Sequence, residues 1–165
     1  MRRLAWRVYD VPVKKTFRIV PLPTEVAEAA REAATRGQTD HRILLADLPA
    51  AAPCRHCLRW AVPGETMILF PYQSIPVGRP YAESGPIFVH QEPCERYLAV
   101  GVYPEVFREG RVVRGYNAQS EIIAAEVPGD DPESKIEAMF VNPEISFLHV
   151  RSMTHGCYTM KVERA

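Results

Sequence analysis

A Cys-x-x-Cys pair, followed later by a histidine and a third cysteine, is the part of the sequence best suited to chemistry. Cys54 and Cys57 have a spacing at which one turn aims two thiolates at a single Zn²⁺. A closed tetrahedral site needs four ligands, and the nearest completion is His90 with Cys94. A thiolate-rich Cys₃His set favours zinc over magnesium or calcium. Zinc is therefore the candidate cofactor, and a small metal- or ligand-binding domain is the leading functional hypothesis.

The same cysteines have two other interpretations. Arg55 and His56 lie between the first two thiols and favour thiolate, as thiol-redox chemistry requires, but no βαβ pattern surrounds them. Free cysteines are also common as small buried hydrophobic residues with no cofactor. Cys157, with His155 two residues earlier, can replace a member of the metal set if the last strand lies nearby. The sequence leaves these alternatives open.

Polar and aromatic residues around the cysteine block are candidates for ligand binding. Either Glu65 or Glu83 can act as general base in metal-assisted hydrolysis, provided that burial raises the pKa of its carboxyl group. Tyrosines beside prolines can line a pocket. The complete predicted ligand-binding set is Arg55, His56, Glu65, Tyr72, Tyr81 and Glu83. A third class of function is a cofactor-free interaction module whose exposed strand edges engage a protein partner.

Several enzyme signatures are absent from the sequence. There is no Walker loop, Gly-x-Gly-x-x-Gly, His-Glu-x-x-His or Gly-x-Ser-x-Gly. The zinc-deaminase pattern needs His-x-Glu ahead of Pro-Cys-x-x-Cys, but the stretch from His41 to Ile43 has no glutamate. Deamination is therefore excluded, and no catalytic residue is assigned.

The elements that must position these residues are short. Apolar runs punctuated by proline and glycine predict mostly antiparallel strands, at 17–22, 43–48, 67–70, 87–90, 98–102, 111–116, 121–127, 145–151 and 157–162. Helices are predicted at 24–36 and 131–140. The expected fold is α+β, a curved or barrel-like antiparallel sheet with two short helices, in a single domain over 1–165.

Particular residues define how the elements should start and pack. Thr24 is the expected N-cap of the first helix and Gly37 its C′ residue, and this helix is assigned no chemistry. Asp131 caps the second helix, which should bury Ile136, Met139 and Phe140. Antiparallel pairing of the runs at 67–70 and 87–90 would return His90 to the cysteine pair. A separation well over ~7 Å between Cys94 and that pair would exclude a shared zinc.

Composition limits the partners. The chain has 165 residues, 47% of them hydrophobic and 24% charged, and its 20 basic residues balance its 20 acidic residues. No nucleic-acid partner is therefore expected. Six basic residues do cluster in the first twenty, at Arg2, Arg3, Arg7, Lys14, Lys15 and Arg18, where a solvated strand face or an anion contact is expected. No apolar run suits a signal peptide or membrane span, which predicts a cytoplasmic protein with reduced thiols.

The order of the blocks resembles a bacterial family known as domain of unknown function 1203. The matching blocks are Pro53-Cys54-Arg55-His56-Cys57-Leu58, Pro63-Gly64-Glu65, Pro71-Tyr72, Gly85-Pro86-Ile87-Phe88-Val89-His90 before Cys94, Arg114-Gly115-Tyr116 and Gly156-Cys157-Tyr158. The resemblance implies a compact bacterial single-domain protein. It carries over no activity and no catalytic residue, so function has to be argued from the residues themselves.

Overall fold

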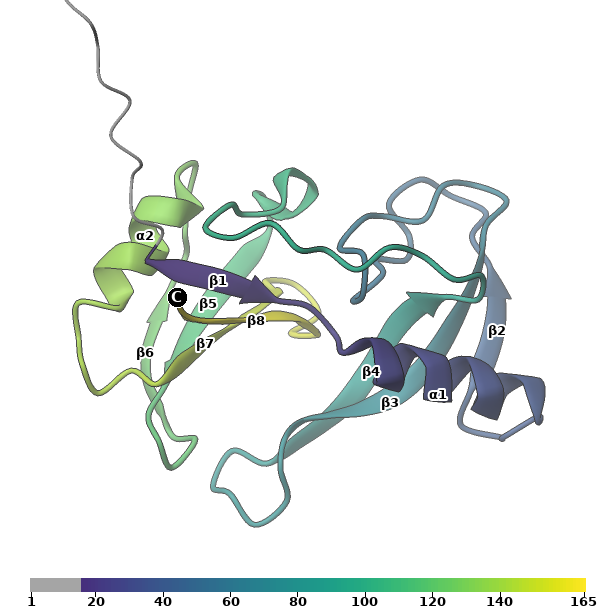
Figure 1. Cartoon of the computed structure of the whole chain (residues 1–165), viewed down its shortest axis with the longest axis horizontal. Helices are drawn as coiled ribbons and strands as arrows, with labels where there is room; N and C mark the ends of the chain where they lie inside the picture. The colour runs from purple at the N-terminus through teal and green to yellow at the C-terminus, as the bar shows by residue number, and fades with distance from the viewer. Residues whose placement is uncertain (1–15) are drawn as a thin grey trace, which may run out of the picture.

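Two antiparallel sheets and two helices make up the fold (Figure 1). The computed structural model describes residues 16–165. In chain order the elements are β1 (Phe17–Val20), α1 (Thr24–Thr35), β2 (Arg42–Leu45), β3 (Thr66–Ile75), β4 (Glu83–His90), the 3₁₀ turn η1 (Glu105–Phe107), β5 (Arg111–Tyr116), β6 (Ile122–Glu126), α2 (Pro132–Met139), β7 (Phe147–Ser152) and β8 (Tyr158–Arg164). The predicted α+β class is confirmed.

The strands form one large and one small sheet, and neither closes into a barrel. The five-stranded sheet has the order β1-β8-β7-β5-β6, with α2 at its side, and the three-stranded sheet has the order β2-β3-β4, with α1 packed on β3 (Figure 1). Each sheet has its own apolar cluster, one including Ile136 and Leu148 and the other Met67 and Ile87. The cysteine block lies where the second cluster meets the first sheet, because Cys54 and Tyr158 both belong to that cluster.

Helix α2 forms as its sequence predicts. The Asp131 carboxylate accepts a 3.0 Å hydrogen bond from the Ser134 backbone N–H, and proline occupies the first helical position. Ile136, Met139 and Phe140 are all buried in the cluster of the large sheet. The predicted cap and the predicted buried face are therefore both confirmed.

Helix α1 departs from the prediction at its start and agrees at its end. The N-cap is Pro23, so Thr24 is the first helical residue and its hydroxyl is free to bond elsewhere. Gly37 has φ +73°, and its N–H donates to Ala34 O while Gln38 N–H donates to Ala33 O. This Schellman pair of bonds needs a left-handed residue, which glycine adopts without a Cβ penalty.

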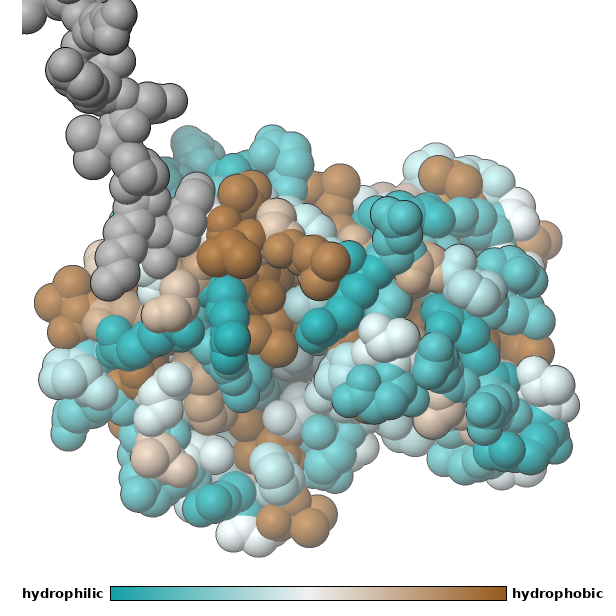
Figure 2. Space-filling model, in the orientation of Figure 1, coloured by the Kyte–Doolittle hydropathy of each residue, from teal (hydrophilic) through white to brown (hydrophobic). Residues whose placement is uncertain are grey.

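The strand predicted at 98–102 is wrong. Only Val100 forms an isolated bridge, to Arg18, and the chain continues as a loop into η1. Leu98, Val100 and Val102 are all exposed, so the alternating apolar pattern has no sheet face to cover. Figure 2 shows brown, apolar atoms on the upper part of the face where this segment runs in Figure 1.

Two sequence-based expectations concern the membrane and the N-terminus. In the part of the chain that the structure describes, no helix is long and apolar enough to cross a membrane. The structure does not describe residues 1–15, which contain five of the six residues of the N-terminal basic cluster. The expectation that no signal peptide is present also concerns this segment. The sixth, Arg18, pairs with Glu163 across β1 and β8.

Candidate metal centre

The first two cysteines project from a tight loop held by backbone hydrogen bonds. Cys54 N–H donates to Arg59 O at 2.9 Å, and Leu58 N–H donates to Cys54 O at 3.1 Å. Leu58, directly after the second cysteine, has φ +55°, a left-handed conformation that is costly for a branched residue. Arg55 N–H donates to Phe88 O, which fixes the loop to β4. We call residues 53–60 the knuckle.

The other two candidate ligands come from the end of the β3–β4 hairpin. The antiparallel register pairs Met67 with His90, so the last residue of β4 lies beside the start of β3. Gln91 N–H donates to Thr66 O, and the chain then turns toward the knuckle and brings Cys94 with it. The predicted return of His90 to the cysteine pair by hairpin pairing is confirmed.

The four candidate ligands converge. One donor atom from each of Cys54, Cys57, His90 and Cys94 lies within 4.8 Å of the others. The Cys54 and Cys94 sulfurs are 3.9 Å apart, and the Cys57 sulfur is 3.5 Å from His90 Nδ1. Cys54 and His90 are buried, while the other two cysteines are partly buried. These residues are close enough to hold one metal ion.

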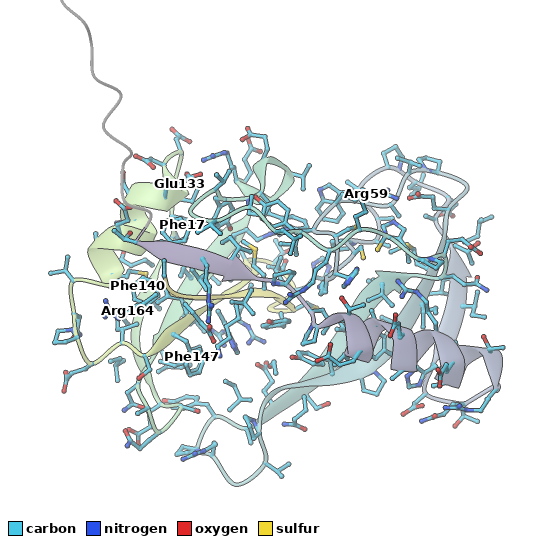
Figure 3. All side chains as sticks on the ribbon, viewed as in Figure 1. Phe17, Arg59, Glu133, Phe140, Phe147 and Arg164 are labelled. Carbon is cyan, nitrogen blue, oxygen red and sulfur yellow. The ribbon has the colours of Figure 1, made fainter. Side chains whose placement is uncertain are left out.

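A chain of polar contacts orients the His90 ring. Its Nε2 lies 3.2 Å from Glu65 Oε2, which leaves Nδ1 facing the sulfurs. Glu65 is in turn gripped by Arg59 through two hydrogen bonds of 2.8 and 2.6 Å, and it accepts a third from Val62 N–H. The Arg59 hydrogen bonds lower the pKa of Glu65 to about 2. Glu65 is therefore an ionised partner of the histidine. Figure 3 shows Arg59 in the loop beside the small sheet.

Nitrogen atoms of two residues lie close to the Cys94 sulfur. His56 Nδ1 is 3.3 Å from it, and the Thr24 hydroxyl lies 3.0 Å from His56 Nε2. Burial lowers the pKa of His56, so the ring is neutral at pH 7 and can present Nδ1–H to sulfur. The second donor is Arg31, whose Nη2 is 3.9 Å from the same sulfur and whose Nε donates to His90 O at 3.1 Å. A thiolate at Cys94 would be stabilised by both.

Without a bound ion, contacts within the cluster shift the pKa values of two of its thiols and of His90 in different directions. Hydrogen bonds from Cys57 and Cys94 hold the pKa of Cys54 far below its usual range, and the same contact with Cys54 raises the pKa of Cys57. Burial lowers the pKa of His90, but hydrogen bonds to Cys54 and Cys94 outweigh burial and raise it to about 9. The cluster thus stabilises a thiolate at Cys54 with a protonated His90 beside it. A cation entering the cluster would displace the remaining protons.

Helix α1 contributes to this cluster although sequence reasoning gave it no chemistry. Thr24 and Arg31 are seven residues apart, hence on one helix face, and Ala27 and Ala34 are buried on the same face. In the sequence, the presence of these two polar residues on an otherwise apolar helix face was the feature that could have indicated a contact with the site. The Thr24 hydroxyl, which was predicted to cap the helix, instead bonds to His56.

The six predicted ligand-binding residues do not converge on one place. His56 and Glu65 contact the candidate metal ligands Cys94 and His90. The Glu83 carboxylate pairs with Arg151 on β7, and Tyr72 packs on the Tyr158 ring at 5.5 Å between centroids. Tyr81 is exposed in the loop between β3 and β4. Arg55, buried in the knuckle, points away from the sulfurs and lines a separate cavity.

Cys157 and His155 are not part of the four-residue cluster. Both line the cavity that Arg55 enters, and Cys157 Sγ lies 3.8 Å from His155 O. Among residues 16–165 the only group of three or more metal-ligating side chains is the one at Cys54, Cys57, His90 and Cys94. His149, interpreted from sequence as structural, is buried among three tyrosine and phenylalanine rings, and burial lowers its pKa to about 3.

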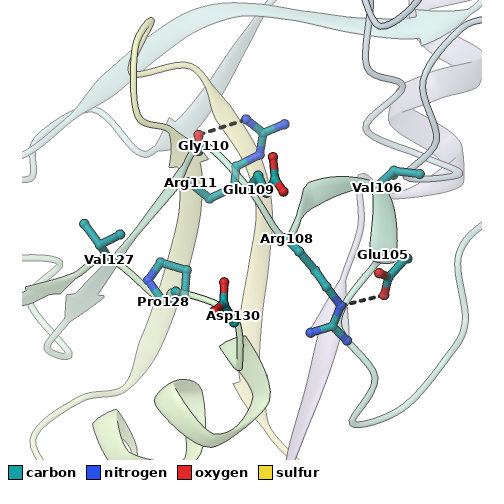
Figure 4. Close-up of a pocket in the computed structure, with 10 residues that line it drawn as sticks. Glu105, Val106, Arg108, Glu109, Gly110, Arg111, Val127, Pro128 and Asp130 are labelled. Atoms are coloured by element: carbon teal, nitrogen blue, oxygen red, sulfur yellow. Dashed lines mark hydrogen bonds and ion pairs between the residues drawn. The ribbon is translucent and has the colours of Figure 1, made fainter.

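A hollow near η1 carries several charged side chains, but its central arginine is already paired. It has a volume of about 510 Å³ and lies between η1 and the loop after β6 (Figure 4). Its Arg108 already pairs with Glu105 and Glu133, at 2.5 and 2.8 Å. The positive charge of Arg108 is therefore already compensated by carboxylates.

Comparison with known families gives one match. The family described as "Protein of unknown function (DUF1203)" matches residues 51–164, which include the knuckle, both sheets except β1 and β2, and all four clustered ligands. No curated protein and no solved structure matches the chain.

Proposed function

The chain belongs to the DUF1203 family, and we propose that it is a zinc-stabilised binding domain in which Cys54, Cys57, His90 and Cys94 hold one Zn²⁺. The observation that carries this proposal is the spacing of the donor atoms. Zn–S bonds of ~2.3 Å and Zn–N bonds of ~2.0 Å at tetrahedral angles place two sulfurs about 3.8 Å apart and a sulfur and nitrogen about 3.5 Å apart. The corresponding distances here are 3.9 and 3.5 Å.

The surroundings of the cluster support zinc as a structural ion. A metal-binding histidine commonly donates its other N–H to a carboxylate, which fixes the tautomer and ring orientation, and Glu65 occupies that position. Three thiolates with Zn²⁺ leave one negative charge, which Arg31 and the His56 N–H can offset at Cys94. Four protein ligands complete a tetrahedron, so the site is of the closed, structural type.

The two enzymatic alternatives are less well supported. Metal-assisted hydrolysis needs an open coordination position and a free base, whereas Glu65 is already bound by Arg59 and His90. Thiol redox needs an accessible attacking thiolate, whereas Cys54, whose pKa is lowered, is fully buried. Neither observation disfavours a structural metal, because structural sites are buried and their ligands are held by outer contacts.

Elemental analysis tests the proposal directly. Protein purified without affinity metal or chelator should contain one zinc per chain, and Cys57→Ser should contain far less. Cys157→Ser is the matched control, because Cys157 lies outside the cluster, and it should keep the full metal content. Metal-free protein titrated with Co²⁺ should show the intense visible bands of tetrahedral thiolate coordination. A wild type that neither contains nor takes up stoichiometric metal would contradict the proposal, as would a metal that Cys57→Ser retains.

A further inference from the structure

A second cavity lies behind the knuckle, on the side away from the sulfurs. It has a volume of about 260 Å³ and is formed where the knuckle, the end of β7 and the start of β8 meet. Its walls combine apolar side chains, among them Trp60 and Phe88, with Arg55, Arg111 and Cys157. A cavity of this size suits a small molecule and excludes a polymer chain.

Two of its lining residues are buried arginines with no acidic partner. Arg55 is 3% exposed and Arg111 is 7% exposed. Within the described residues 16–165, neither forms an ion pair, and no aspartate or glutamate lines the cavity. The other deeply buried arginine, Arg151, has Glu83 as its partner. The two arginines at this cavity therefore differ from Arg151 in having no carboxylate beside them.

The hydrogen bonds of both arginines are incomplete. Arg55 donates from Nε to Tyr158 O at 2.8 Å and from Nη1 to Pro53 O. Arg111 donates from Nη1 to Gly110 O at 3.1 Å, but its buried Nε has no partner. Backbone carbonyls carry no net charge, so they leave the two cations uncompensated. A buried charge without a counter-charge is unfavourable.

The Arg111 guanidinium also stacks on two rings. Its carbon Cζ lies 4.8 Å from the Phe107 centroid and 5.7 Å from the Trp60 centroid. These contacts stabilise a cation and hold the guanidinium plane in place, but they supply no acceptor for Nε. Guanidinium groups stay protonated in proteins, so both side chains carry a positive charge. An oxyanion in the cavity would supply the missing negative charge.

We propose that this cavity binds a small organic anion, with its carboxylate or phosphate group between Arg55 and Arg111 and its apolar body against Trp60 and Phe88. Because Arg55 lies between the two knuckle cysteines, the metal centre on one side of the knuckle would order the anion site on the other. The inference otherwise stands independently of which metal is bound.

The test measures thermal unfolding of the zinc-loaded full chain at constant ionic strength. The probes are phenyl phosphate, benzoate and inorganic phosphate, with chloride as the reference salt. At a concentration of 100 times Kd, a bound anion should raise the melting temperature by about 5–10 °C in a chain of this size. The shift should saturate, and at least one of the two aromatic anions should bind more tightly than inorganic phosphate, because only the former reach the apolar wall.

Matched variants locate the effect. Arg111→Gln should weaken binding at least tenfold, while Arg114→Gln, three residues along β5 and absent from the cavity, should bind as the wild type does. If Arg111→Gln does not fold, protection of Cys157 from alkylation by the same anions in the wild type replaces this arm.

Three results would overturn the inference: no saturable shift or protection with any probe, an Arg111→Gln variant that binds normally, or inorganic phosphate binding as tightly as both aromatic anions. Zinc content is measured on every sample. A zinc-loaded protein whose melting temperature does not respond to anions contradicts this inference alone. A protein that cannot bind zinc contradicts the proposed function.

Discussion

Removing one thiolate and removing the metal should destabilise the protein through the same loss. In Cys57→Ser, an inert buried thiol replaced by a hydroxyl would cost only ~1–3 kcal/mol. At roughly 2–4 °C per kcal/mol for a chain of this length, that is about 2–12 °C in melting temperature. If Cys57 is a zinc ligand, the free energy of metal binding is also lost, because a structural ion binds only the folded state.

The structure indicates how large the additional loss should be. In the described part of the chain, few hydrogen bonds fix the segment 91–97 apart from the candidate ligands. They are Gln91 N–H to Thr66 O, Tyr97 N–H to His56 O, the Tyr97 hydroxyl to Val102 O and Arg96 to Pro21 O. Net contributions of about 1 kcal/mol each cannot replace the ~10–16 kcal/mol measured for zinc in small folded sites. We therefore expect a decrease well beyond the ~12 °C upper limit for an inert thiol.

Calorimetry of four samples provides the assay: wild type and Cys57→Ser, each with and without a strong chelator. Chelator alone and substitution alone should each lower the melting temperature substantially, and together they should do little more than the larger of the two, since both empty one site. Cys157→Ser should keep the full chelator response. Additive losses, or a wild-type melt that chelator leaves unchanged, would refute the argument for zinc.

Three further predictions follow from the site and the core. Glu65→Gln should weaken zinc binding 10–100-fold, because the variant loses the carboxylate that orients His90. A competition titration against a chromophoric chelator measures this affinity, and the exposed control Glu144→Gln should bind zinc as the wild type does. Equal affinities for Glu65→Gln and the wild type would exclude this orienting role. Burial depresses the pKa of His149 to about 3 in the folded protein, so the unfolded chain gains a proton first as pH falls below ~6.5. Stability should therefore be lost between pH 6.5 and 3, by about 2 kcal/mol at pH 5, and melting curves of His149→Gln should lose less than wild type over the same range. In zinc-loaded protein a thiol reagent should react rapidly with Cys157 alone and with all four cysteines after chelation; four fast thiols before chelation would contradict ligation.

The local part of the candidate site could be predicted from sequence. Cys54 and Cys57 are joined by one turn, so their convergence needs no knowledge of the fold. His90 and Cys94 required one further step, the antiparallel pairing of β3 with β4, which alternating apolar residues and proline-rich turns made recognisable. Helix α2 could also be predicted, because its capping aspartate, its first-turn proline and the spacing of its apolar residues all indicate the same helix.

The contacts that the sequence did not reveal depend on packing between distant segments. Arg31 and Thr24 reach the site only because α1 packs on β3, an arrangement that no short-range pattern encodes. The failed strand at 98–102 has a related cause. Alternation signals a strand only when a sheet edge accepts it, and here the edge strand β1 offers a single bridge to Val100. Propensity was overridden by tertiary context.

The pairing of β1 with β8 has a consequence for synthesis of the chain. All four candidate ligands lie before residue 95, so a nascent chain can assemble the knuckle and the β3–β4 hairpin while the ribosome is still making the rest. The large sheet must wait, because β1 needs a partner strand that ends at Arg164. Until then Phe17 and Ile19 have no partner strand to hold them against the apolar cluster, and the bond from Arg55 to Tyr158 cannot form. The half of the protein that holds the candidate ligands could thus fold early in translation, and the cavity behind the knuckle only once β8 has left the ribosome.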